Sequence, residues 1–183
     1  MKMMHTPIVV AFAALFAAAA AHAESPAPQA AGDNSRIAVE WGDPSQLTEY
    51  RRARDGSARR DVESSLKSLS KHLRNRADKM LPEGQSLHVQ INDLDLAGEY
   101  EPWNRGGYEH VRIIRSIYPP EIKLSYALRD AQGQLLREGE TTLHDPSFQL
   151  GVSPVDQDAL RYEKRMLDNW LRREFGTQET AQN

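Results

Sequence analysis

One stretch of the chain decides the fold: Glu121-Ile122-Lys123-Leu124-Ser125-Tyr126-Ala127-Leu128-Arg129. Its even-numbered residues are apolar and, apart from Ala127, its odd-numbered residues are polar. Strict alternation of this kind predicts a β-strand with one face buried and one face in water. The turn residues Asp130 to Gly133 follow, and the chain returns from Leu135 to Leu143. We therefore expect a β-hairpin whose apolar face has to be covered by another element.

A first amphipathic helix that can cover this face is predicted from Ser57 to Leu81. Its apolar residues recur every three or four positions: Val62, Leu66, Leu69, Leu73, Ala77 and Met80. That spacing draws one apolar stripe along a helix, and the remaining positions are mostly charged or small and polar. Pro82 and Gly84 end the pattern, as expected after a helix.

A second amphipathic helix is predicted near the end of the chain. Ser153 and Pro154, followed by Asp156, have the composition of a helix start, with serine as N-cap and proline at the first helical position. Apolar residues then cover one broad side as far as Phe175, and Gly176 is expected to be the C-terminal cap.

The other predicted strands complete the sheet. Arg36 to Trp41 alternates over a short length, and Leu87 to Leu96 alternates with a change of phase in the middle. Because a one-residue slip turns every following side chain over, we predict a β-bulge near Asn92-Asp93 that returns Leu94 and Leu96 to the core. Residues 110–129 contain Pro119-Pro120, and the sequence allows one bent strand or two separate ones.

The predicted order is β-α-β-β-β-α. It indicates an α+β fold, a two-layer sandwich in which an antiparallel sheet of about four strands carries both helices on one face. The domain organisation that follows is a signal peptide over residues 1–23, a flexible Pro/Ala-rich leader over 24–35, a single domain over 36–176 and a polar tail over 177–183.

The N-terminus predicts export. An apolar run from Ile8 to Ala21 follows Lys2, and Ala21-His22-Ala23 is a small-x-small cleavage pattern, so we expect cleavage after Ala23 and a periplasmic product. Cleavage leaves 22 basic and 26 acidic residues, a net charge of −4 that argues against a nucleic-acid partner. The chain contains no cysteine, so no disulfide can form, and no later stretch is long and apolar enough for a transmembrane segment.

No catalytic motif is found. The sequence lacks Gly-x-Ser-x-Gly, His-Glu-x-x-His and a phosphate-binding glycine loop, and we predict no catalytic residue, no metal site and no cofactor. An alternative is a periplasmic hydrolase that uses a constellation of carboxylates, for which the candidates are Asp93, Asp95, Asp145 and Glu163. Glu163 falls inside the apolar arc of the second helix, where a carboxylate is costly unless paired. The favoured interpretation is a structural ion pair with Arg112 or Arg115.

Two surfaces are candidates for ligand binding. The first is a cluster of five arginines at the entry to the first helix, suited to an anionic lipid or glycan: Arg51, Arg52, Arg54, Arg59 and Arg60. The alternative for this cluster is a solvated run neutralised by nearby acids. The second surface is the glycine-flanked loop that carries Tyr100 and Trp103, which equally well folds back on the sheet.

The chain resembles a bacterial family known as domain of unknown function 3016. The resemblance covers about Ile37 to Phe175 and is carried by Leu81-Pro82-x-Gly84-Gln85, Asp93-Leu94-Asp95-Leu96-Ala97-Gly98, Pro120-x-Ile122-x-Leu124-x-Tyr126, Gly139-Glu140 with Leu143-x-Asp145, and Leu160-Arg161-Tyr162-Glu163-Lys164-x-Met166-Leu167-x-x-Trp170. It implies an exported protein of Gram-negative bacteria and transfers no catalytic residue.

These observations favour a non-enzymatic periplasmic binding or envelope-accessory protein that recognises an anionic envelope component or a partner protein. A structural stress protein without a small ligand is a further alternative.

Overall fold

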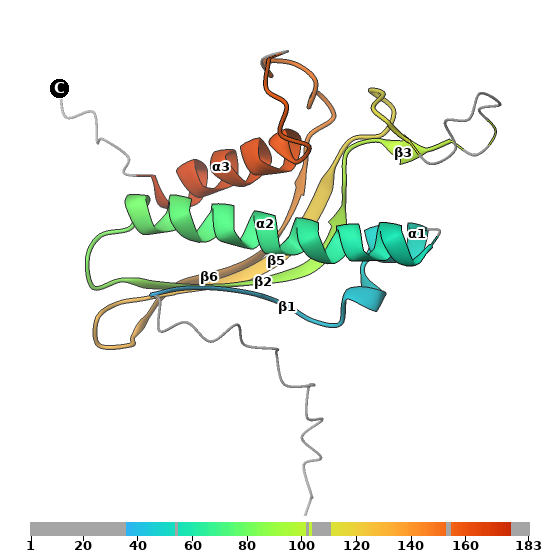
Figure 1. Cartoon of the computed structure of the whole chain (residues 1–183). Helices are drawn as coiled ribbons and strands as arrows, with labels where there is room; N and C mark the ends of the chain where they lie inside the picture. Colours follow the sequence, from blue (N-terminus) through green and yellow to red (C-terminus); the bar gives the residue numbers. More distant parts are fainter. Residues whose placement is uncertain (1–35, 54, 102, 104–110, 153–154, 177–183) are drawn as a thin grey trace, which may run out of the picture.

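A computed structural model describes residues 36–53, 55–101, 103, 111–152 and 155–176. The predicted signal peptide, leader and polar tail lie outside these residues. A four-stranded sheet forms one layer, and helices α2 (Gly56–Met80) and α3 (Arg161–Phe175) cover one of its faces (Figure 1). The sheet strands are β1 (Ile37–Trp41), β2 (Ser86–Asp95), β5 (Glu121–Arg129) and β6 (Leu135–His144). The predicted two-layer α+β sandwich is confirmed.

The sheet is mixed, which corrects the expectation of a fully antiparallel one. Its strand order is β1-β2-β5-β6, and β1 runs parallel to β2, with Ile37 opposite Leu87. The chain leaves β1, passes through α2 and enters β2, and a crossover of that kind returns the next strand in the same direction. The pairs β2–β5 and β5–β6 are antiparallel, as the hairpin pattern predicted.

The predicted β-bulge is confirmed. Ile91 pairs with Leu124 and Asp93 pairs with Lys123, so Asn92 is an extra residue in β2. The register shift turns Leu94 inward, and its side chain is fully buried. After the bulge β2 stays paired with β5 to its last residue, Asp95, and the next residues, Leu96 and Ala97, line the cleft described below.

Residues 111–129 form two separate strands, not one bent strand. β4 (Arg112–Ile113) pairs with β3 (Glu99–Tyr100) in a small second sheet. A turn then follows, in which the Tyr118 N–H donates to the Arg115 carbonyl at 3.0 Å. The two prolines after this turn separate β4 from β5, because proline cannot donate to a ladder.

The predicted start of α3 is wrong. Ser153 and Pro154 lie outside the described residues, and α3 begins only at Arg161, without a side-chain cap at Leu160. The aspartates before it hold the backbone in turns: Asp156 accepts the N–H of Asp158 at 3.0 Å, and Asp158 accepts the N–H of Leu160 at 2.9 Å. Such local bonds compete with helix formation. The predicted C-cap, Gly176, is confirmed.

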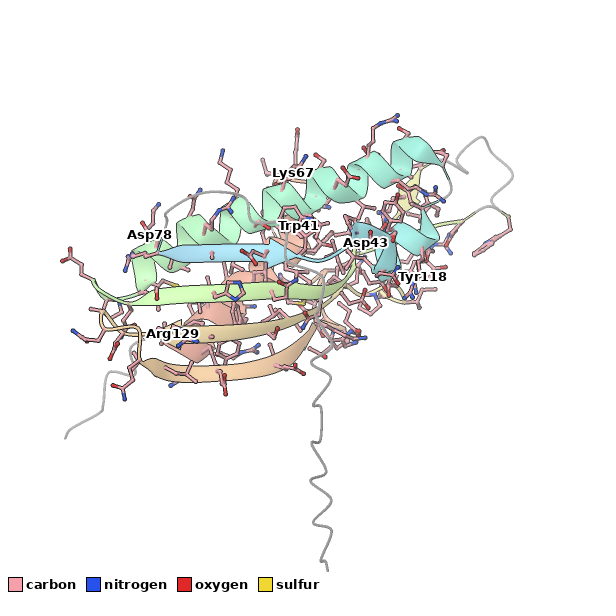
Figure 2. All side chains as sticks on the ribbon, turned by 90° about the horizontal axis from the view of Figure 1, so that it is seen from below. Trp41, Asp43, Lys67, Asp78, Tyr118 and Arg129 are labelled. Atoms are coloured by element: carbon pink, nitrogen blue, oxygen red, sulfur yellow. The ribbon has the colours of Figure 1, made fainter. Side chains whose placement is uncertain are left out.

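The core lies between the helices and the sheet. Leu124 of β5 and Leu167 of α3 belong to the same buried cluster, together with the predicted stripe of α2 apart from Met80, which is only partly buried. The opposite face of the sheet is polar, and Figure 2 looks onto it. There His88 contacts Glu40 at 3.2 Å, and Asn92 donates to Ser125 at 3.3 Å. This face needs no second layer.

Gly98 joins β2 to β3 in a conformation that favours glycine, with φ of +86°. A Cβ at this position would lie 2.7 Å from the Ile113 carbonyl oxygen and 2.6 Å from Ile114 Cδ1. Gly133, in the β5–β6 turn, has a similar φ of +78° but open space around it. We expect Gly98→Ala to lower the free energy of unfolding by at least about 2 kcal/mol more than Gly133→Ala does, measured by urea denaturation. Equal losses would show that backbone conformation alone, and not the clash, sets the cost.

Candidate ligand-binding cleft

A cleft of about 450 Å³ opens beside the N-terminal half of α2. Its other walls are the segment before α3, the end of β2 and the start of the small second sheet. The residues that line it include Glu49, Asp61, Val62, Ser65, Leu96, Ala97, Tyr100, Arg112, Leu160 and Glu163. We call it the Glu163 cleft. Apolar walls with a few polar groups are typical of a small-molecule site.

Glu163 is the most unusual group of this cleft. It lies in the first turn of α3 and is only 1% exposed. Its Oε1 accepts the Ala97 N–H at 2.8 Å, whereas Oε2 is buried without a hydrogen-bond partner. Burial raises the pKa of Glu163, and the Ala97 N–H, the N–H of Glu163 itself and the charge of Arg112 only partly oppose that rise. A carboxylate oxygen left without a partner can accept from a bound group once the residues around it move apart.

Glu49 and Arg112 form an ion pair at one end of the cleft. Glu49 is placed by the short helix α1 (Thr48–Arg52) and is 3% exposed. Its Oε1 accepts from Arg112 Nη2, and its Oε2 accepts the Leu96 N–H at 3.0 Å. Burial raises the pKa of Glu49, and the charge of Arg112 opposes that rise. Both oxygens of Glu49 are thus used within the protein.

Arg112 ties the end of β2 to the small sheet. Its Nη1 donates to the carbonyls of Leu96, Ala97 and Gly98, at 3.3, 3.4 and 2.9 Å. Its guanidinium lies 4.8 Å from the centre of the Tyr100 ring. Tyr100 therefore folds back onto Arg112, whereas Trp103 is 66% exposed. The two aromatic residues of the predicted loop surface do not act together, and only Tyr100 lines the cleft.

The arginine cluster does not form one recognition surface with the cleft. Arg52 pairs with Asp95 at 2.7 Å and lies 3.5 Å from Glu99, and Arg59 stacks over the Tyr50 ring at 5.3 Å. Arg51 donates to the Thr48 hydroxyl, Arg60 is exposed and Arg54 lies outside the described residues. An anionic ligand for the exposed arginines stays a prediction.

The expected ion pair of Glu163 with Arg112 or Arg115 is not formed as a direct contact in the described part of the chain. Arg112 pairs with Glu49, and Arg115 pairs with Glu101 at 3.0 Å. Glu101 is itself 1% exposed, and the second pair joins the residues that follow β3 to those that follow β4. Glu163 instead uses a backbone N–H, which a sequence pattern does not show.

The carboxylates considered for a hydrolase do not meet in the Glu163 cleft. Asp93 accepts from the N–H and hydroxyl of Thr48 at 2.7 and 2.9 Å and so caps α1. Asp95 pairs with Arg52, and Asp145 pairs with Arg165 at 3.0 Å. Glu163 alone of the four lines this cleft. Among the residues that the structure describes, no group of acids or histidines could hold a metal ion, and no helix is long and apolar enough to cross a membrane.

The sequence pattern did not indicate Glu49 and Asp61 as residues of the site. Glu49 lies in a helix of five residues, which is too short to show an apolar period. Asp61 lies on α2 and contributes to the cleft beside Ser65, although the residue itself is exposed. The order of residues along the chain does not show that these residues lie near Glu163, because they come from distant parts of the sequence.

Comparison with known proteins finds one family. The model of a protein of unknown function (DUF3016) matches residues 35–173. The chain belongs to this family. The match covers both layers of the sandwich and every cleft residue named above. Neither the curated proteins nor the solved structures include a match to this DUF3016 protein.

Proposed function

We propose that this DUF3016 protein is an exported, non-enzymatic binding protein of the bacterial envelope, and that its ligand binds in the Glu163 cleft. The observation that carries the proposal is the buried Oε2 of Glu163, which has no partner although Glu163 is one of the residues that line a cleft of about 450 Å³. Leaving a buried polar atom unpaired usually costs about 1–3 kcal/mol, and a bound ligand can offset that cost. The cleavable N-terminal segment predicted from the sequence supports export.

A hydrolase is the less favoured alternative. A raised carboxyl pKa in a cleft suits an acid catalyst, and Glu163 has that property. A hydrolase that works through a pair of carboxylates needs a second available one, however, and both oxygens of Glu49 and both oxygens of Asp158 are already bonded. Asp61 is exposed, which leaves its carboxylate in water. Binding therefore explains the geometry with fewer requirements.

Blocking the cleft tests the proposal. Ser65 is a half-buried residue on the α2 wall, and we expect Ser65→Trp to fill the space with an indole ring. The matched control is Lys67→Trp, because Lys67 lies on the same helix (Figure 2), is exposed and is not among the residues that line the cleft. The mature protein, isotope-labelled, is titrated with a low-molecular-weight extract of bacterial periplasm, and the amide resonances of Leu96 and Ala97 are followed.

The unmodified protein and Lys67→Trp should show the same shifts of these two amides, and Ser65→Trp should lose them. Intact mass of the protein recovered from periplasm should correspond to a chain that starts at Glu24. Shifts that persist in Ser65→Trp would contradict binding in the cleft, and a retained N-terminus in the recovered protein would contradict cleavage after Ala23.

A further inference from the structure

Among the residues that line the Glu163 cleft, no cation is free to pair with an anionic ligand, and the other side-chain donors are the hydroxyls of Ser64, Ser65, Ser68 and Tyr100, which can equally well accept. The lining cation, Arg112, is bound to Glu49 and to three backbone carbonyls. The acceptors are less fully used, because Glu163 Oε2 has no partner and Asp61 is exposed at the same cleft. A ligand that brings its own N–H donors and a positive charge therefore suits this lining better than an anion does.

From this inventory, and building on the proposed function, we propose that the Glu163 cleft binds the ammonium group of a small aliphatic amine. Glu163 supplies the buried counter-charge, and Asp61 supplies a second, exposed one. The hydroxyl of Ser65 lies on the same wall, and Val62, Leu96 and Leu160 provide apolar surface for methylene groups. A volume of about 450 Å³ is in the range of small-molecule sites.

The geometry of Glu163 favours an ammonium over a guanidinium. A guanidinium pairs best with two carboxylate oxygens at once, through two parallel N–H bonds. Glu163 has only one oxygen to offer, because the Ala97 N–H holds the other at 2.8 Å. An ammonium acts as a compact charge and needs a single acceptor at each N–H.

The wall next to Glu163 leaves room for entry. Residues 155–160 have no regular secondary structure and are held by the aspartate turns described above and by the bonds of Arg161 and Lys164 to Asp158. Ala159 in this segment is exposed although it lines the cleft. Glu163 Oε2 is closed to water in the free protein, so binding at this atom requires a local shift of the residues around it.

The test uses 1,5-diaminopentane as the probe, 1,5-pentanediol as its neutral counterpart and glutarate as its anionic one. Each is titrated into the mature protein at about 0.15 M salt, with calorimetry and with the Ala97 amide resonance, because that N–H donates to Glu163. We expect the diamine to bind at least tenfold more tightly than the diol or glutarate. Affinity should keep rising as the pH increases above about 4.5, the ordinary pKa of a glutamate, since burial raises the pKa of Glu163 and the carboxyl must lose its proton to pair with a cation.

Variants identify the counter-charges. Glu163→Gln keeps an oxygen for the Ala97 N–H, removes the charge and should weaken diamine binding at least tenfold. Asp61→Asn should weaken it less, because that carboxylate is exposed. Glu63→Gln is the control, since Glu63 is an exposed acid two residues after Asp61 and does not line the cleft.

The outcomes separate this inference from the proposed function. Equal binding of the diol or of glutarate overturns the ammonium preference, and so does the absence of any Ala97 shift with the diamine. Equal losses of diamine affinity in Glu163→Gln and Glu63→Gln also overturn it, because they indicate general attraction of the diamine to an acidic surface. None of these results contradicts a cleft ligand of another class, which the Ser65→Trp comparison tests on its own.

Discussion

Replacing Arg112 with alanine is expected to lower the free energy of unfolding by about 3–5 kcal/mol, the usual range when one partner of a buried ion pair is removed. Arg112 has a side chain that is 21% exposed, and that of Glu49 is 4% exposed. The substitution leaves the Glu49 carboxylate buried without its cation. It also removes the donor to three consecutive carbonyls and the cation that stacks on Tyr100.

Urea denaturation with a double-mutant cycle measures this effect. Arg112→Ala should cost clearly less in a Glu49→Gln background, because no buried charge then remains unpaired. Arg60→Ala, at an exposed position, should change stability by less than about 0.5 kcal/mol. Additive effects of the two cleft substitutions would contradict a coupled pair.

The pH dependence of the Arg112→Ala variant has a defined sign. Burial raises the pKa of Glu49 above its unfolded value, and Arg112 lowers it again in part. Without Arg112 the pKa of Glu49 rises further, so the folded state binds its proton more tightly than the unfolded state does. The variant should therefore lose stability more steeply than the unmodified protein as pH rises from about 4.5, the unfolded value, through the new folded pKa.

Glu163→Gln is expected to raise the free energy of unfolding at pH 8. The buried carboxyl has a pKa raised chiefly by burial, so the folded state binds its proton more tightly than the unfolded state does. Its ionisation lowers stability as pH rises from about 4.5 through the folded pKa, by about 1.4 kcal/mol for each unit of pKa shift. Glutamine has nearly the same shape and carries no charge, so it avoids this loss.

Urea denaturation at pH 4 and at pH 8 checks the prediction. At pH 4 the Glu163 carboxyl is largely protonated in both the folded and the unfolded state, so the free energies of unfolding of the variant and the unmodified protein should differ little. At pH 8 the variant should be the more stable of the two. Lower stability of Glu163→Gln at pH 8 would show that an ionised Glu163 is well solvated or paired, and would remove the basis for a ligand-binding carboxylate.

The two effects expected of Glu163→Gln point in opposite directions. The substitution should stabilise the free protein and weaken its binding of an amine. A polar group that lowers stability where a neutral isostere fits is typical of a functional site. Arg112 contrasts with it, since its substitution should damage the fold first. The pair of experiments therefore separates the group that holds the cleft together from the group that meets the ligand.

Local pattern predicted most of the architecture. Three local patterns were informative: the alternation from Glu121 to Arg129, the phase change at Asn92 and the apolar stripe of α2. Each shows which side chains of a short segment face the core and which face water, because hydrophobic periodicity follows that division. The start of α3 was wrong because Asp156 and Asp158 satisfy backbone N–H groups outside a helix, which competed with the apparent cap. The parallel direction of β1 was not predicted, because the alternation in a short strand does not show which neighbouring strand it will pair with.

The candidate site was only partly visible in the sequence. The position of Glu163 inside an apolar arc indicated a buried carboxylate, and the structure confirms that burial. Its actual neighbours are the Ala97 N–H, Arg112 and Glu49. They come from the segment after β2, from β4 and from α1, and only the tertiary fold brings these parts of the chain to α3. The sequence by itself thus determined which residues leave water, because that choice depends on the polarity of each side chain and its spacing. Only the tertiary structure decided which of them meet, because hydrogen bonds and charge pairs act over a few ångströms between segments that the chain order keeps far apart.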